Sequence, residues 1–388
     1  MKGFGVLLLP LALLLAACGG GNPAATPAPG PAGTPQGASP TPGPTAPTPL
    51  PTGFRVEVIA RRLEVPWALA FAPDGRLFFT ERPGHVRVIK DGQLQPQPWV
   101  ELPVAQVGEG GLLGLALDPN FGRNGYVYVY YTYRAQGGLR NRVVRLRERD
   151  GRGDEATTIL DGIPGANIHD GGRIKFGPDG KLYIGTGDAS QSALAQDPRS
   201  LAGKVLRLNP DGSIPSDNPF PGSPVYSLGH RNPQGLAWHP QTGQLFETEH
   251  GPSANDEVNI VQAGKNYGWP QVGELRDPRF VDPVLWSRQE TWAPAGAAFY
   301  DGDRLPFWRG SLLFAALRGE HLHRVILRPP DFTSVERDED LLSGQYGRLR
   351  DVLVGPDGLL YIATSNRDGR GSPAAEDDRI LRLVPAGP

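Results

Sequence analysis

The sequence has few of the residues and motifs that support several common kinds of chemistry. Its 388 residues include one cysteine and one methionine, which excludes an intramolecular disulfide and a zinc site built from several cysteines. No Gly-x-Ser-x-Gly nucleophile motif is present. The formal net charge is only −2 at pH 7, and this weak charge argues against a nucleic-acid partner held by bulk electrostatics.

Long hydrophobic runs are also scarce. The run at the N-terminus, from Val6 to Ala17, follows Lys2 and ends in Leu15-Ala-Ala-Cys18. It is shorter than a membrane-spanning helix needs, and it fits a secretory signal with a lipoprotein cleavage box. We therefore predict that residues 1–17 are a signal peptide and that a lipid on Cys18 anchors the exported protein to a membrane of the bacterial cell envelope. The alternative is an ordinary cleaved signal that happens to end near a cysteine.

The next segment has no charged residue at all. Residues 19–52 are almost entirely Gly, Pro, Ala, Thr and Ser, a composition that cannot bury enough apolar surface to become ordered. We predict that residues 18–52 form a disordered tether between the lipid and a folded body that spans residues 53–388.

The body has the composition of one large all-β domain. Glycine (52 residues) and proline (41 residues) are plentiful, and no segment shows a long 3.6-residue periodicity. Turns such as Pro73-Asp-Gly75, Pro178-Asp-Gly180 and Pro356-Asp-Gly358 separate short apolar segments that recur as hairpins. The expected first strands are at 76–80, 125–131, 181–185, 244–248, 311–315 and 359–363, and their partners are at 85–89, 142–146, 204–208, 256–260, 321–326 and 379–384.

Six such hairpins, spaced about fifty to seventy residues apart, match a six-bladed β-propeller better than a sandwich. The segment from Phe54 to Ile59 is expected to pair with the last blade, because this pairing closes the ring and removes exposed sheet edges. Propellers collect loops from every blade at one end of a central channel, so the loops are where we look for chemistry.

Two loops carry residues suited to acid–base chemistry. His169 stands in Ile168-His-Asp-Gly-Gly-Arg173, and the strand that follows ends in Gly185-Thr-Gly-Asp188. A histidine at a channel mouth with an aspartate at the next strand end forms a natural general base. A buried structural histidine is the alternative.

Two further loops gather hydrogen-bond donors. Arg231, Asn232 and Gln234 surround a proline, and such donors are costly to bury unless something accepts their hydrogen bonds. Arg348 and Arg350 alternate on a strand and so share a face, where an anion between them would relieve their repulsion. The alternatives are a solvated turn for the first set and an exposed face with counter-charge from Asp351 for the second.

Oxygen ligands for a metal are concentrated in one segment. Gly251-Pro252 is followed closely by Asp256 and Glu257, and carbonyl and carboxylate oxygens are the ligands that calcium prefers. The spacing is not that of an EF-hand. His321 and His323 share a strand face, but no third ligand is evident from the sequence, so they are interpreted as structural or surface residues.

Taken together, these segments resemble the family of soluble glucose and aldose sugar dehydrogenases that use pyrroloquinoline quinone (PQQ), also called glucose/sorbosone dehydrogenases. The resemblance extends from about Val56 to Leu383 and is carried by Gly111-Leu-Leu-Gly114, His169 with Gly172-Arg173, His230 to Gly235, Gly251-Pro252 with Asp256-Glu257, Asn266 to Pro270, and Arg348-Leu-Arg350. It implies a propeller enzyme that oxidises aldose sugars to lactones with PQQ and calcium, and that passes the electrons to an acceptor that the sequence does not identify.

The resemblance also implies residue roles. His169 would take the proton of the anomeric hydroxyl while hydride passes from the sugar C1 to the quinone C5, and Asp188 would orient this histidine. Arg231 and Asn232 match residues at the quinone oxygens, and Gln234 of the same string is placed with them as a cofactor-binding residue. Arg348 and Arg350 match residues that hold the cofactor carboxylates.

Calcium is implied at the carbonyls of Gly251 and Pro252, where it would polarise the quinone. A second, structural calcium is implied at Glu257, the Tyr267 carbonyl and Asp277.

Two positions depart from the glucose-specific pattern. Arg318 replaces a lysine that reaches the cofactor, and arginine can still pair with a carboxylate. Glu109 replaces a glutamine before the Gly-Leu-Leu-Gly turn, and this change predicts a broad aldose preference.

Two other functions fit a propeller. A calcium-dependent lactonase would need a metal lined by side-chain carboxylates, and Arg231, Arg348 and Arg350 argue against it. A non-catalytic propeller that binds glycans or proteins at the cell surface would tolerate replacement of His169.

Overall fold

The computed structural model describes residues 53–272 and 277–386. The predicted signal peptide (1–17) and the predicted lipidated Cys18 with its tether (18–52) lie outside the described residues. Within the described ranges, no helix has both the length and the apolar character needed to cross a membrane.

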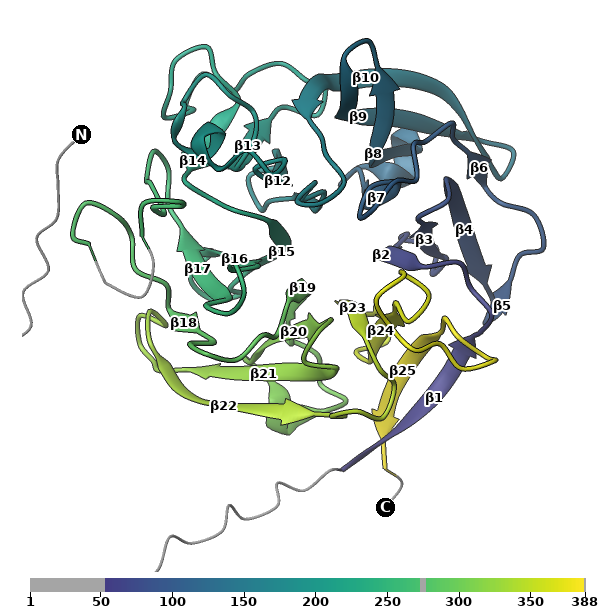
Figure 1. Ribbon diagram of the computed structural model, residues 1–388. Helices are drawn as coiled ribbons and strands as arrows, with labels where there is room; N and C mark the ends of the chain where they lie inside the picture. Colours follow the sequence, from purple (N-terminus) through teal and green to yellow (C-terminus); the bar gives the residue numbers. More distant parts are fainter. Residues whose placement is uncertain (1–52, 273–276, 387–388) are drawn as a thin grey trace, which may run out of the picture. The chain divides into compact units, whose positions relative to one another are not determined.

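The body is a six-bladed β-propeller, as the repeat predicts (Figure 1). The first three blades consist of β2 (Pro66–Phe71), β3 (Leu77–Glu81), β4 (His85–Lys90), β5 (Gln93–Leu94) and β6 (Val100–Glu101); β7 (Leu112–Leu117), β8 (Tyr126–Ala135), β9 (Gly138–Arg149) and β10 (Arg152–Pro164); and β11 (Ile174–Phe176), β12 (Leu182–Thr186), β13 (Lys204–Leu208) and β14 (Val225–Leu228).

The last three blades consist of β15 (Pro233–Trp238), β16 (Leu245–Glu249), β17 (Glu257–Val261) and β18 (Leu285–Trp286); β19 (Pro294–Phe299), β20 (Leu312–Ala316), β21 (His321–Leu327) and β22 (Val335–Leu341); and β23 (Leu349–Val354), β24 (Leu360–Thr364), β25 (Ile380–Pro385) and β1 (Phe54–Ala60). Helix is limited to α1 (Phe121–Asn124) and the 3₁₀ turns η1 (Ser192–Gln196) and η2 (Pro306–Trp308) in the described ranges.

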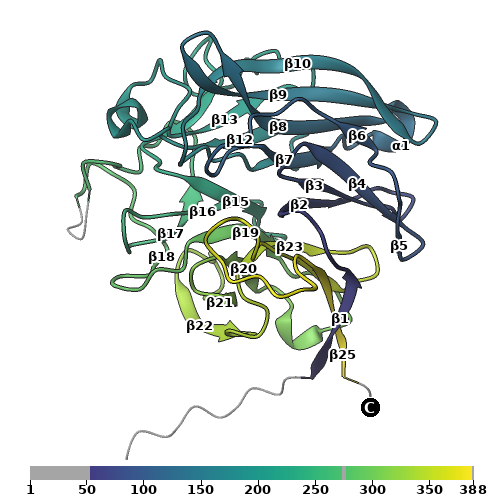
Figure 2. The same cartoon turned by 45° about the vertical axis from the view of Figure 1, so that its right-hand side comes forward.

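The ring closes through the strand nearest the N-terminus. β1 pairs antiparallel with β25, with Val56 opposite Leu383, so the last blade combines the two ends of the described chain (Figure 2). The expected pairing of this segment with the last blade is therefore confirmed, and it gives the final sheet its fourth strand.

The expected hairpins correspond to the two middle strands of each blade. In the third blade, for example, β12 and β13 pair with Leu182 opposite Leu208. Apart from β23, which the alternation of Arg348 and Arg350 predicted, the innermost strands were not expected from the sequence. Among them, β7 (sequence LLGLAL) and β19 (sequence PAGAAF) are buried along almost their whole length, so they lack the alternation that marks a half-exposed strand.

Aromatic side chains pack edge to face at every junction between neighbouring blades. The ring centroids of these pairs are 4.9–5.8 Å apart, and each such pair stabilises a protein by about 0.5–1.5 kcal/mol beyond its area burial. The pairs are Phe78–Phe121, Tyr128–Phe176, Tyr183–Trp238, Phe246–Phe299, Trp308–Phe54 and Tyr361–Phe71. Apolar packing thus continues around the whole ring.

The centre of the ring holds a buried ion pair. Arg173, just before β11, lies 3.2 Å from Asp351 of β23, and its guanidinium also covers the Trp67 ring of β2 at 4.4 Å. Arg173 Nε donates to the carbonyl of Gln234 in β15 at 2.7 Å. One side chain therefore connects four blades across the channel.

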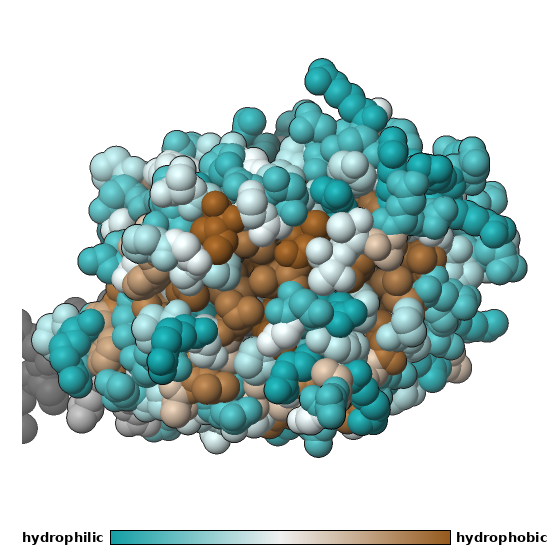
Figure 3. All heavy atoms as spheres, turned by 90° about the horizontal axis from the view of Figure 1, so that it is seen from above, coloured by the Kyte–Doolittle hydropathy of each residue, from teal (hydrophilic) through white to brown (hydrophobic). Residues whose placement is uncertain are grey.

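One side of the ring combines a polar margin with a hydrophobic middle. Figure 3 shows one side of the ring, where hydrophilic side chains surround hydrophobic ones visible between them. In the part of the chain that the structure describes, the exposed large hydrophobic residues are Val58, Ile214 and Phe307. They lie in β1, in the loop between β13 and β14, and in η2.

Candidate active site

Loops from all six blades line one cavity of about 540 Å³. Its ionisable lining residues are Arg82, Glu109, His169, Arg231, His250, Asp256, Arg318, Arg348, Arg350, Asp368 and Arg370. Six arginines therefore face three carboxylates, which gives the walls an excess of positive charge. A cavity of this character suits a polyanionic ligand of small-molecule size.

The structure brings most of the predicted site residues to this cavity. Glu109, His169, Arg231, Gln234, Gly251, Pro252, Arg318, Arg348 and Arg350 line it. Asp188, Asn232, Glu257, Tyr267 and Asp277 are not in its walls, so their positions are considered separately below.

His169 is held in an uncommon backbone conformation at the cavity wall. Its φ of 64° lies in the left-handed region that residues other than glycine rarely adopt. Its Nδ1 lies 2.7 Å from Oδ1 of Asp188. Because a carboxylate accepts hydrogen bonds, this contact places the ring hydrogen on Nδ1 and leaves the lone pair on Nε2. A neutral imidazole held in this way can act as a general base.

Asp188 is a buried support for this histidine. It is 1% exposed, and its second oxygen accepts a hydrogen bond from Trp269 Nε1 at 2.8 Å. The close approach of the two loops depends on Gly187, where a Cβ atom would lie 1.8 Å from the carbonyl oxygen of His169. Asp188 therefore has the position expected of a residue that orients His169.

Glu109 fixes the histidine loop from the other side. One oxygen accepts the backbone N–H of His169 at 2.9 Å, and the other pairs with Arg370 at 2.8 Å. The nearby Gly-Leu-Leu-Gly turn permits this arrangement, since a Cβ on Gly114 would lie 2.1 Å from the carbonyl oxygen of Gly172. Glu109 thus places a carboxylate beside the base and within the cavity wall.

Arg348 and Arg350 are buried and share one counter-ion. Asp368 lies 2.8 Å from Arg348 and 3.4 Å from Arg350. The alternative of an exposed face balanced by Asp351 is wrong, because Asp351 points toward Arg173 on the other side of β23. Burial lowers the pKa of Arg350 to about 9; Asp368 opposes this shift, whereas the nearby charges of Arg348 and Arg82 add to it. One carboxylate does not balance this cluster of cations, and an anionic ligand would stabilise it.

The string from His230 to Gly235 contributes unequally to the cavity. Arg231 lines it, with Nη1 donating to the carbonyl of His250 at 3.0 Å. Gln234 also lines it, and its side-chain oxygen accepts from Arg350 at 2.7 Å. Asn232 is fully buried behind the wall, where its oxygen accepts the N–H of Gly171 at 3.0 Å. In this structure Asn232 supports the histidine loop.

Several buried donors at the cavity have no partner. Arg82 Nε and Arg231 Nε make no hydrogen bond within the described protein, although buried polar atoms are normally satisfied. The His250 imidazole also has an unpartnered Nε2, and burial first, then Arg350 and Arg231, lower its pKa well below the usual value. These unpartnered groups fit a ligand that carries several acceptor oxygens.

The predicted calcium segment forms part of the same wall. Gly251 and Pro252 line the cavity, and the Gly251 N–H donates to Asp256 at 2.8 Å. The other oxygen of Asp256 accepts the N–H groups of Trp292 and Ala293 at 2.6 and 2.8 Å. Asp256 therefore fixes this loop, and the carbonyls of Gly251 and Pro252 remain the candidate metal ligands.

The three residues predicted for a second metal site do not all line one cavity. Glu257 and Tyr267 line a small adjoining cavity of about 40 Å³ together with Glu249. Asp277 does not line it and instead forms an ion pair with Arg279, so the geometry does not support its assignment to this site. The physical reason is local, because the guanidinium two residues along the chain already holds the Asp277 carboxylate.

Glu249 is the carboxylate that lies beside Glu257 in the wall of this small cavity. Burial, and then the neighbouring carboxylates, raise the pKa of Glu249 and of Glu257 to about 8. No lysine or arginine forms an ion pair with either side chain in the described ranges. A divalent cation would hold both groups in their charged form, so the residues fit a calcium ion.

The sequence analysis missed four cavity residues: Arg82, His250, Asp368 and Arg370. The sequence repeat itself contains a signal for Arg82 and His250. Buried threonines stand at equivalent places near the ends of three strands. They are Thr80 in β3, Thr186 in β12 and Thr248 in β16. The residue two positions later is Arg82, Asp188 or His250, so this register marks side chains at the mouth of the ring.

A second, larger cavity of about 840 Å³ lies between the first two blades. It is lined by residues such as Lys90, Trp99 and Glu148. It contains none of the predicted site residues and no histidine, so we place the chemistry in the six-blade cavity.

Comparison with known proteins shows the family to which the chain belongs. The family model described as Glucose / Sorbosone dehydrogenase matches residues 63–375. Aldose sugar dehydrogenase YliI of Escherichia coli K12 is 34% identical over 82% of this chain and 92% of its own length.

Two solved structures are similar over most of the body. The PQQ-bound form of aldose sugar dehydrogenase from Streptomyces coelicolor is 41% identical, with a TM-score of 0.77, over 86% of this chain and 99% of its own. An oxidoreductase described as a glucose dehydrogenase, from Thermus thermophilus, is 52% identical, with a TM-score of 0.79, over 86% of this chain and 100% of its own.

Proposed function

The chain belongs to the glucose/sorbosone dehydrogenase family, and on this premise we propose that it oxidises aldose sugars to lactones with PQQ bound in the six-blade cavity. The observation that carries the proposal is the combination of that cavity's six arginines with the His169–Asp188 pair in and behind its wall. The arginines supply the charge and the donors for a polyanionic quinone, and the pair supplies a base for a sugar hydroxyl.

Arginines from different blades would contact the cofactor. Arg348 and Arg350, brought together by β23, would hold the carboxylates of the cofactor in competition with Asp368. Arg231 and Gln234 would contact it from the fourth blade, and Arg318 from the fifth. Bound PQQ supplies a two-electron acceptor for the hydride that leaves the sugar C1.

His169 performs the proton transfer. Its Nε2 would take the proton of the anomeric hydroxyl as the C1 hydrogen leaves with its electron pair, so the sugar loses two electrons and two hydrogens and becomes a lactone. Asp188, on Nδ1, keeps the lone pair on Nε2 and stabilises the imidazolium that forms.

The proposal also includes two calcium ions. The carbonyls of Gly251 and Pro252 would hold one ion beside the cofactor, and Glu249, Glu257 and Tyr267 would hold a second, structural ion. The role of the first ion is to polarise the quinone as a Lewis acid. Glu109 would contact the sugar and favour broad aldose specificity, and the electron acceptor is left open. We also propose that the protein works in the cell envelope, anchored through Cys18.

The experiment that tests this function is dye reduction by the purified protein. We expect reduction of an artificial electron acceptor by several aldoses, and only when PQQ and calcium have both been added. Absence of dye reduction, with no change in PQQ absorbance on mixing, would contradict the proposed dehydrogenase function.

A variant of His169 distinguishes proton transfer from PQQ binding. His169→Asn retains a residue type that tolerates the left-handed conformation and removes the base. We expect it to bind PQQ as the wild type does and to lose turnover by at least about 10²-fold. Persistence of turnover would contradict the role assigned to His169. A non-catalytic binding propeller would show no turnover in the wild type either.

A further inference from the structure

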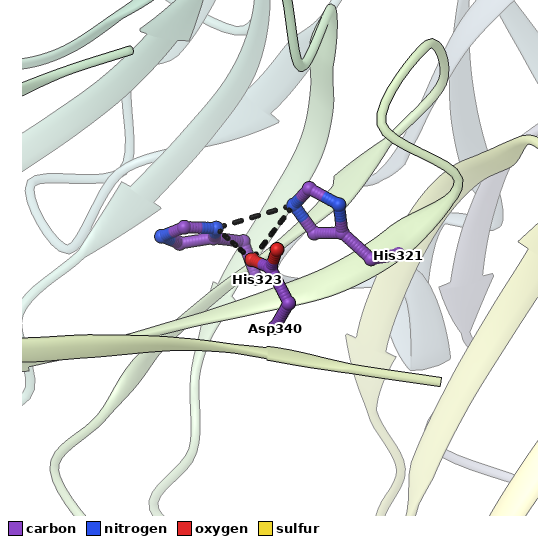
Figure 4. Close-up of side chains that lie close together, drawn as sticks. All are labelled: His321, His323 and Asp340. Carbon is purple, nitrogen blue, oxygen red and sulfur yellow. Dashed lines mark hydrogen bonds and ion pairs between the residues drawn. The ribbon is translucent and has the colours of Figure 1, made fainter. Parts of the chain in front are cut away.

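Two histidines on β21 and an aspartate on β22 converge in the fifth blade, and none of the three lines the six-blade cavity. His323 and Asp340 stand opposite each other in the antiparallel pair. His321, two residues earlier, shares the same face of β21 (Figure 4). The two imidazoles are almost completely buried, with His321 at 3% and His323 at 2% exposure, whereas Asp340 is exposed.

Three potential ligand atoms meet within a small space. His321 Nε2 is 3.2 Å from His323 Nδ1, and Asp340 Oδ1 is 3.2 Å from the first and 2.8 Å from the second. Ligands that bind a tetrahedral zinc ion at about 2.0–2.1 Å lie about 3.3 Å from one another. The observed separations are close to that spacing.

The outer nitrogens of both rings are already committed to acceptors. His321 Nδ1 contacts the carbonyl oxygen of Gly319 at 3.0 Å, and His323 Nε2 contacts Asp338 at 3.1 Å. Because these oxygens can only accept, each ring carries a hydrogen on its outer nitrogen, and its inner nitrogen points toward Asp340. Each imidazole is therefore oriented as metal-binding histidines usually are.

The surroundings hold this arrangement in place. The His323 ring stacks on Phe314 at 4.6 Å and packs against Trp292 at 4.7 Å. Gly319 leaves room for the other ring, since a Cβ there would lie 2.5 Å from Cε1 of His321. The imidazoles are thus fixed by packing, while the exposed side of Asp340 leaves access for an ion and a water ligand.

We propose that His321, His323 and Asp340 form a zinc site, with two nitrogen ligands, one carboxylate oxygen and one open position. Nitrogen donors in a tetrahedral arrangement favour zinc over calcium, which takes six to eight oxygen ligands. The site lies directly after the turn that carries Arg318 into the six-blade cavity. A bound ion would therefore connect β21 to β22 and stabilise this turn.

Cobalt(II) is a suitable spectroscopic probe for the test. The protein is freed of transition metals with a chelator, saturated with calcium to fill oxygen-rich sites, and titrated with Co²⁺ and then Zn²⁺. We expect one Co²⁺ per chain with visible absorption bands of a low-coordinate site, and displacement of Co²⁺ by Zn²⁺. Absence of these bands in the wild-type protein would overturn the proposal.

Variants connect the signal to these residues. Asp340→Asn changes an exposed side chain, and His323→Gln removes a nitrogen ligand; each is expected to weaken zinc binding by at least about ten-fold. Glu336→Gln makes the same charge change on an exposed residue of the same strand and should bind as the wild type does. Equal zinc affinity of Asp340→Asn and wild type would overturn the proposal even if His323→Gln fails to fold. The readout is metal binding, so its failure is independent of PQQ and of turnover.

Discussion

At the scale of single residues, the site depends on how His169 is held. Its left-handed backbone, its N–H bond to Glu109 and its ring contact with Asp188 all act on one side chain. A residue in such a conformation costs on the order of 1–3 kcal/mol and persists only where its surroundings enforce it. This rigid placement suits a catalytic base, because proton transfer requires close alignment of the reacting groups.

The support given by Asp188 can be tested by Asp188→Asn. The change removes the charge that stabilises the imidazolium and weakens control of the tautomer, so kcat should fall by about 10²–10⁴-fold. PQQ affinity should stay close to that of the wild type, because Asp188 is not in the cavity wall. Trp269→Phe removes only the hydrogen bond to the other oxygen of Asp188 and should lower kcat by about ten-fold or less. Steady-state kinetics with dye reduction measure both, and an unchanged kcat in Asp188→Asn would contradict the role.

Glu109→Gln tests the residue that departs from the glucose-specific pattern. Removing a negative charge from a cavity that receives an anion should raise PQQ affinity by several-fold, on the order of 1 kcal/mol. It should also raise KM for aldoses, since a carboxylate accepts stronger hydrogen bonds from sugar hydroxyls than an amide does. Titration with PQQ and a comparison of kcat/KM among aldoses check the two effects. Lower PQQ affinity would contradict the charge argument.

Some residues of the candidate site could be predicted from the sequence, and others could not. His169, Arg231, Arg348 and Arg350 could be predicted, because each stands in a polar string beside a strand end. Asp368 could not, because its role as a shared counter-ion depends on the approach of the loop after β24 to β23. Glu249, and not Asp277, lines the small cavity beside Glu257 and Tyr267, since resemblance of a string does not indicate which carboxylate points inward.

At the scale of elements, the first and fourth blades share one hydrogen bond to the next blade. Thr248 near the end of β16 donates its hydroxyl to the Ala295 carbonyl of the next blade at 2.7 Å, and Thr80 donates likewise to the Leu113 carbonyl. These bonds fix the strand ends, so the residue two positions later is delivered to the mouth of the ring. The loops are therefore positioned by the framework, which explains how distant segments build one cavity.

Gly187→Ala tests this positioning at the end of β12. The added Cβ would overlap the carbonyl oxygen of His169 at 1.8 Å, so the histidine loop must move. We expect kcat to fall by at least about 10²-fold, since small displacements of catalytic groups have effects of this size. Gly122→Ala is the control, because its Cβ would meet nothing within 4 Å. Dye reduction measures the loss and far-UV circular dichroism checks the fold; full activity in Gly187→Ala would contradict the account.

The elements themselves were predictable in part. Pro-Asp-Gly turns, which lie just before the first middle strand in three of the blades, give a local signal, and apolar segments that recur after such turns predicted the two middle strands of each blade. The inner strands such as β19 are short, glycine-containing and buried throughout, so only their packing against neighbouring blades defines them.

At the scale of the whole molecule, the ring concentrates like charges that calcium would balance. Burial and mutual repulsion raise the pKa values of Glu249 and Glu257 to about 8, well above the ordinary glutamate value of 4.5. The folded state therefore holds protons that the unfolded state releases, so without calcium stability should fall as pH rises from about 4.5 to about 8.

Calcium should reverse this trend. The ion keeps both carboxylates charged, so its stabilising effect should be larger at pH 8 than at pH 5.5, where protons compete with it. We expect chelation to lower Tm by several degrees more at pH 8, and Glu257→Gln to remove most of that difference. Thermal unfolding followed by circular dichroism measures it; a chelator effect that is equal at both pH values would contradict the site.

The most direct test of the account is a calorimetric titration of the calcium-loaded protein with PQQ. The wild type should bind one PQQ per chain. Arg350→Met should bind PQQ at least about ten-fold more weakly, because a buried charged partner is lost. Arg199→Met is the control and should bind PQQ as the wild type does, because the Arg199 side chain is 90% exposed. Failure of the wild type to bind PQQ, or unchanged affinity in Arg350→Met, would contradict the claim that the six-blade cavity is a quinone site.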